Sequence, residues 1–179
     1  METQHSPSPL RDMATEQRAA EREARVVRAP RFFRTLGVVT AALVVTGGYV
    51  HLCLYRHGYK AIPKIGVGFL LQVVASAIVA AALLAGPRRI ARMARITDRL
   101  AGTVTGLAAA ALSTGTLAAF ALTRTPGGLF NFQERGLQPS PQALIALLAE
   151  LGVLGVLGVG LVADHVGGRA AQPIAAAPV

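Results

Sequence analysis

Apolar residues are concentrated in four long stretches that short polar segments separate. The stretches cover residues 35–55, 65–86, 100–123 and 143–163. Each is about twenty residues long, and a helix of that length reaches about 30 Å, the thickness of the hydrocarbon core of a bilayer. None has a polar face along its full length, as a surface helix of a soluble protein would. The pattern predicts an all-α, polytopic membrane protein folded as an antiparallel four-transmembrane-helix bundle.

The predicted spans divide the chain into a transmembrane domain and two tails. We expect a basic cytoplasmic N-terminal tail at residues 1–33, a four-helix transmembrane domain at 34–166 and a cytoplasmic C-terminal tail at 167–179. The spans are placed at about 34–56, 63–86, 99–123 and 142–164. Residues 11–27 are rich in Ala, Glu and Arg and predict a helix in the first tail, which we expect to end at Pro30.

The arginines predict how the spans are oriented. Most of them precede the first span or lie in the connection at residues 87–99, and four crossings would place both groups on one side of the membrane. The positive-inside rule then predicts an inner-membrane protein with both termini in the cytoplasm and residues 56–64 and 124–141 outside. This distribution also accounts for the net charge of +9 without nucleic acid as a partner.

Small residues at a spacing of three or four predict the faces on which the helices pack, because helices in a bilayer associate through close backbone approach. In the second span these are Gly68, Gln72, Ser76 and Ala80; in the third, Gly102, Gly106, Ala110, Thr114 and Ala118. In the first span they are Gly37, Ala41, Gly47 and Gly48, and in the fourth Gly152, Gly155 and Gly158.

Two ionisable residues, His51 and Glu150, interrupt the apolar spans. A charge at mid-membrane costs about 2.5–3.5 kcal/mol on insertion scales, so each residue needs a partner or an aqueous cavity. We expect a ligand-binding cluster of His51, Glu150 and Gln72 in the outer half of the bundle. His57 and Glu134 are expected in the polar segments that cover this cluster. Two interpretations stay open: a polar pair that fixes helix register, or a pocket that binds a ligand or handles protons.

No segment carries a specific catalytic or cofactor motif. Cys53 is the only cysteine, which excludes an intramolecular disulfide and with it the four-helix quinone-linked disulfide oxidoreductases. His51 and His57 are six residues apart, a poor spacing for a metal, and His165 lies too far from His51 to share a haem iron with it. We therefore expect no metal, no cofactor and no enzymatic activity.

These observations favour a non-enzymatic structural or accessory membrane component. Its expected partners are membrane lipids and either another membrane protein or a second copy of the chain. The alternative is a binder of a small molecule, such as a lipid or a quinone, or a proton-coupled carrier that uses an outer-leaflet polar pocket. A protein partner that co-purifies in mild detergent would support the accessory component, whereas a bound lipid or quinone would support the binder.

A resemblance to known membrane proteins rests on four short segments. They are HLCLYRHGY at residues 51–59, IPKIG at 62–66, FLLQ at 69–72 and GLFNFQE at 128–134. In residues 34–165 the chain resembles a group of small four-helix membrane proteins of GC-rich, actinobacterial-type bacteria, a group without an assigned activity. More distantly, it is similar in architecture to DoxX-type proteins. The resemblance implies the fold and the membrane location only.

Overall fold

The computed structural model describes the backbone of residues 9–170 and the side chains of residues 31–167. Its elements are the helix α1 (Pro9–Arg56), the 3₁₀ helix η1 (Tyr59–Ala61), and the helices α2 (Ile65–Ala85), α3 (Pro87–Ala94), α4 (Asp98–Leu122) and α5 (Gln142–Ala170). Four segments are long and apolar enough to cross a membrane: Arg31–Arg56, Ile65–Ala85, Asp98–Leu122 and Gln142–Gly167. The predicted all-α polytopic bundle is confirmed.

The chain divides into two units, Met1–Thr35 and Leu36–Val179. In the first unit, α1 begins at Pro9 and continues through Pro30, so the helix end predicted there is wrong. A proline removes one hydrogen bond from a helix, and here the helix continues on both sides of that position. Residues 1–8 and 171–179, which belong to the predicted tails, lie outside the described residues.

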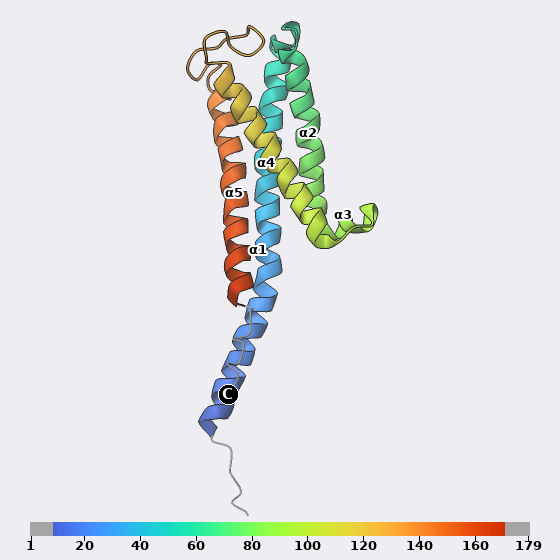
Figure 1. Ribbon diagram of the computed structural model, residues 1–179, viewed down its shortest axis with the longest axis vertical. Coiled ribbons are helices and arrows are strands. Elements are labelled where there is room, and N and C mark those ends of the chain that lie inside the picture. The colour runs from blue at the N-terminus through green and yellow to red at the C-terminus, as the bar shows by residue number, and fades with distance from the viewer. Residues whose placement is uncertain (1–8, 171–179) are drawn as a thin grey trace, which may run out of the picture. The chain divides into compact units, whose positions relative to one another are not determined.

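In the second unit, α1 is the central helix. It runs between α2 and α5, and α4 crosses the bundle obliquely (Figure 1). Two glycine contacts show how closely the backbones approach: a methyl group at position 48 would lie 2.7 Å from Ser76 Cβ of α2, and one at position 152 of α5 would lie 3.1 Å from a methyl group of Leu43. The buried core between the helices includes Val44, Val79, Ala109 and Val153.

The predicted packing face is right on α1 and wrong on α4, and on α2 it is right only in part, because Gly68 is exposed. Ala41, Gly47 and Gly48 of α1 and Ser76 and Ala80 of α2 are buried. On α4 the buried residues are Ala101, Ala109 and Ser113, one position before the predicted Gly102, Ala110 and Thr114. Small residues occur on several faces of α4, so their spacing does not show which face packs against the other helices. A shift of one residue turns the predicted face by about 100°.

The predicted face of α5 is also partly wrong. Gly152 contacts Leu43 of α1, but Gly155 is exposed and methyl groups at positions 155 and 158 would meet open space. Ala146, Ala149 and Val153 form the buried face instead. The glycines of α5 repeat every three residues, and because a helix turn has 3.6 residues they do not stay on one face. Alanine and valine therefore form the close contacts of this helix.

The two ends of the bundle differ in structure. At one end, which we call the loop end, η1 joins α1 to α2 and the loop of residues 123–141 joins α4 to α5. At the other, the α3 end, α3 and a turn connect α2 to α4. Pro87 occupies the first turn of α3, and the Thr97 side chain caps α4 by accepting a hydrogen bond from the Leu100 amide at 3.2 Å.

Candidate functional site

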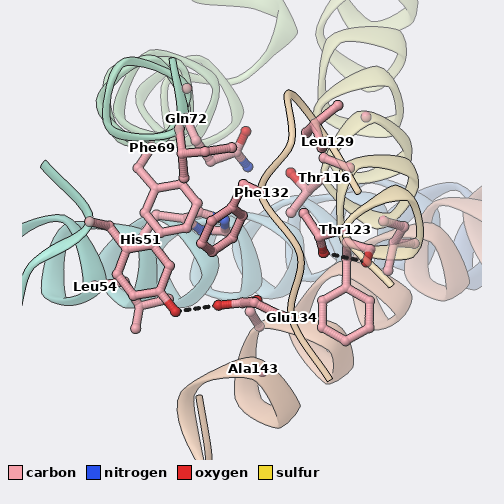
Figure 2. Close-up of a pocket in the computed structure, with 18 of the residues that line it drawn as sticks. His51, Leu54, Phe69, Gln72, Thr116, Thr123, Leu129, Phe132, Glu134 and Ala143 are labelled. Carbon is pink, nitrogen blue, oxygen red and sulfur yellow. Dashed lines mark hydrogen bonds between the residues drawn. The ribbon is translucent and has the colours of Figure 1, made fainter. Parts of the chain in front are cut away.

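A cavity of about 320 Å³ lies at the loop end of the second unit. Residues of α1, α2, α4 and α5 line it, and η1 and the loop of residues 123–141 cover it. Its walls are mostly apolar and include Phe69, Leu112, Leu117, Phe120, Leu129, Phe132 and Leu147 (Figure 2). A cavity of this size and character fits a small molecule with a large apolar part.

Three polar side chains, two buried and one half-buried, form what we call the polar cluster of the cavity: His51 from α1, Glu150 from α5 and the half-buried Gln72 from α2. The Gln72 amide Nε2 donates a hydrogen bond to Glu150 Oε1 at 3.4 Å. Only 3% of Glu150 and 8% of His51 are exposed. The structure therefore brings together in one cavity the three residues that the sequence places in the outer half of the bundle.

His51 and Glu150 are connected through Gly47. The imidazole Nδ1 of His51 lies 2.8 Å from the Gly47 carbonyl oxygen, and a methyl group at position 47 would lie 2.8 Å from Glu150 Oε1. Among the described residues, no hydrogen bond or salt bridge joins the two side chains directly. Both side chains thus approach Gly47 of α1 without a hydrogen bond or salt bridge to each other.

The hydrogen bond of His51 fixes its tautomer. A carbonyl oxygen can only accept, so Nδ1 carries the proton, and in the neutral ring Nε2 is left as an acceptor. The ring lies edge to face with Phe69, with the centroids 5.1 Å apart. Within the described part of the chain, Nε2 has no hydrogen-bond partner, so it is free to accept from a ligand.

Tyr59 and Glu134 connect η1 to the covering loop. The Tyr59 hydroxyl donates a hydrogen bond to Glu134 Oε1 (Figure 2). Its ring stacks on Phe69, with a centroid distance of 4.9 Å, and meets Phe132 edge to face at 5.9 Å. Burial, the hydrogen bond to Glu134 and the negative charge of that residue raise the pKa of the Tyr59 phenol well above its usual range. The phenol therefore stays protonated and keeps donating.

Arg124 anchors the covering loop. Its guanidinium donates hydrogen bonds to the carbonyl oxygens of Gly136 at 2.8 Å and Gln138 at 2.9 Å, and lies 3.4 Å from Glu134 Oε2. It also lies over the Phe120 ring, 3.3 Å from its centroid. One half-buried side chain thus connects the end of α4 to the second half of the loop.

A narrow turn shapes the loop over the cavity. The backbones of Leu129 and Phe132 exchange two hydrogen bonds of 2.9 Å, and Gly128 has a φ of +61°. A methyl group at position 128 would lie 2.0 Å from the Phe132 carbonyl oxygen, so only glycine fits there. This turn holds Leu129 and Phe132 against the cavity.

His57 does not belong to the cavity. Its side chain is exposed, its Nδ1 lies 2.6 Å from the Cys53 carbonyl oxygen, and it faces a separate surface pocket with Tyr49 and Arg56. His57 follows the last turn of α1, where six residues from His51 correspond to a rotation of about 240° around the helix axis, so the two imidazoles point to different sides.

Glu134 lines the cavity, but its partners are not the cationic residues of the first hairpin. Arg124 and Tyr59 hold its carboxylate, and Lys64 lies instead over the Phe130 ring, 5.2 Å from its centroid. Sequence reasoning missed Arg124 because a basic residue after a span is usually a topology signal. It missed Tyr59 because only the folded hairpin brings η1 beside the loop.

The arrangement can hold an amphipathic molecule: the walls accept an apolar body and the polar cluster accepts hydrogen bonds. Among the described residues, no group of three His, Cys, Asp or Glu side chains could bind a metal ion.

Comparisons of the chain with protein-family models, with curated proteins and with solved structures found no match. The case for a binding site therefore rests on the geometry of the cavity.

Proposed function

We propose that this multi-pass membrane protein binds a small amphipathic molecule in the cavity at its loop end. One observation carries the proposal: a mostly apolar cavity of about 320 Å³ ends on the polar cluster of His51, Gln72 and Glu150, in which His51 and Glu150 are buried. A polar pair that only fixed helix register would explain the bond between Gln72 and Glu150. It would not explain the cavity beside that bond or the free Nε2 of His51.

The arginines support an orientation in which the loop end faces outward from an inner membrane. Arg88, Arg89 and Arg92 of α3 and the basic residues at the start of α1 would then lie in the cytoplasm, together with both termini. In that orientation, the cavity lies at the depth of the outer leaflet. Its ligand would come from that leaflet or from the outer aqueous phase.

Binding, rather than catalysis, is the role that these residues support. The polar cluster offers acceptors and one carboxyl group, but none of its members is a nucleophile activated by a neighbouring base. We therefore propose a receptor or carrier for the bound molecule that needs no cofactor.

The proposal is tested by purifying the protein in a mild detergent and identifying what stays bound by mass spectrometry. We expect one small amphipathic molecule per chain. Recovery of a stoichiometric protein partner, with no small molecule on the chain, would overturn the proposal and support a structural or accessory role.

A further inference from the structure

Of the charged side chains that line the cavity, all but Glu150 are near an oppositely charged or aromatic partner. Arg124 and Glu134 form an ion pair at 3.4 Å, and Lys64 lies over the Phe130 ring at 5.2 Å. Glu150 accepts from the uncharged Gln72, and among the described residues no cationic nitrogen lies within 4.0 Å of its carboxylate. At the mouth of the cavity Arg124 and Glu134 thus neutralise each other and Lys64 keeps its positive charge over a ring, whereas Glu150 has no cation beside it.

The groups around Glu150 come from every helix of the bundle. Gly47 approaches it from α1, Gln72 from α2 and Ser113 from α4, and His51 of α1 lines the same cavity. His51 makes no salt bridge with it and donates its Nδ1 proton to a backbone carbonyl. The Ser113 hydroxyl is completely buried beside Glu150 and carries no charge, so toward a carboxylate it can only donate a hydrogen bond. Nothing supplied by these helices neutralises a negative charge on Glu150.

A carboxylate that is 97% buried between apolar helices is stable only if it is protonated or paired with a positive charge. Without a ligand, a bound proton keeps the polar cluster neutral. A cation inside the cavity would do the same, and the aromatic and aliphatic walls would accommodate an apolar body attached to that cation.

We infer that the bound molecule is an apolar monovalent cation of the ammonium type, which pairs with Glu150 and displaces its carboxyl proton. This inference rests on the proposed function, because it names the chemical class of the ligand of the same cavity. In the exchange, the O–H bond of the carboxyl group breaks, its electron pair stays on the carboxylate oxygen, and the proton leaves to water. The net charge inside the cavity is unchanged.

The inference is tested by titrating the detergent-solubilised protein with benzyltrimethylammonium and, separately, with the neutral benzyl alcohol, by calorimetry in two buffers of different protonation enthalpy. For the cation we expect about one proton released per molecule bound and weaker binding as the pH falls, because protons compete for the same carboxylate. Glu150→Gln should weaken cation binding by at least about tenfold. Asp164→Asn, the same change at an exposed carboxylate of α5, should leave it unchanged.

Several outcomes would overturn the inference. If benzyl alcohol binds and the cation does not, the ligand class is wrong although the cavity still binds a small molecule, as proposed. If neither probe binds, the cavity takes neither an apolar cation nor a neutral aromatic alcohol, and both proposals fail. If the Glu150→Gln protein does not fold, the proton count on the unchanged protein still decides, since cation binding without proton release contradicts the exchange.

Discussion

Glu150 of α5 lies directly against the α1 backbone at Gly47: a methyl group at position 47 would lie 2.8 Å from Glu150 Oε1. The carbonyl oxygen of the same glycine accepts the hydrogen bond from Nδ1 of the His51 ring. One residue without a side chain therefore contacts both ionisable groups of the polar cluster. The missing side chain of Gly47 thus accounts both for the close approach of α1 and α5 and for the geometry of the candidate site.

The first prediction concerns Gly47→Ala. The new methyl group should push the flexible Glu150 carboxyl group away and break its bond to Gln72, at a cost of about 1 kcal/mol in the free energy of unfolding. The loss in the free energy of ligand binding should be larger than the loss in the free energy of unfolding. Thermal unfolding in detergent, together with calorimetry, measures both. Gly155→Ala, at an exposed position of α5 with open space around it, is the matched control. Unchanged binding in Gly47→Ala would contradict the account.

Gly48→Ala should be more damaging to the fold than Gly47→Ala. The new methyl group would lie 2.7 Å from Ser76 Cβ, an atom fixed to the α2 backbone, so the two helices themselves must separate. We expect a loss of about 1–3 kcal/mol in the free energy of unfolding. The melting temperatures of the two variants, compared in one detergent, test this order. A Gly48→Ala protein as stable as the unchanged one would show that α1 and α2 do not pack as described.

Arg124→Ala should loosen the covering loop without unfolding the bundle. The change removes the hydrogen bonds to the Gly136 and Gln138 carbonyl oxygens and the ion pair with Glu134. Hydrogen exchange should become faster across residues 125–138, while the amides in the middle of the spans keep their protection. Arg135→Ala, which changes an exposed arginine of the same loop, is the control. Equal exchange in the two variants would remove Arg124 as the anchor.

Tyr59 should ionise at unusually high pH. Burial and the contact with Glu134 raise the pKa of its phenol above the ordinary value of about 10. The folded protein then holds this proton more tightly than the unfolded chain does. The resulting stability is present below the ordinary pKa and is lost as the pH rises above it. The difference between the phenolate absorbance of the unchanged protein and that of Tyr59→Phe isolates this group. An ionisation near the ordinary pKa would contradict the described contact.

The sequence predicts the spans well because their length and apolarity are set by the bilayer, a property of each segment alone. It also places His51, Gln72 and Glu150 together, since polar residues at similar depth in neighbouring spans must turn away from lipid. Helix rotation is harder to predict. On α4, Ala109 and its neighbour Ala110 are equally small, and only contacts with other helices decide that Ala109 is buried.

The covering loop could not be predicted for a related reason. Arg124, Glu134 and Tyr59 meet because two segments, far apart in the chain, fold over the same cavity. Nothing in the local pattern around each residue carries that information. His57 lies outside the cavity because sequence proximity to His51 does not show which side of the helix end a residue occupies.

Native mass spectrometry of a cavity-filling variant tests the central claim most directly. Gly115 of α4 lines the cavity, and a methyl group there would meet open space, so Gly115→Phe should fill the cavity without disturbing the helices. We expect the unchanged protein to carry one bound small molecule, Gly115→Phe to lose it at an unchanged melting temperature, and the control Gly155→Phe to retain it. A bound molecule retained by a folded Gly115→Phe protein would show that this cavity is not the binding site.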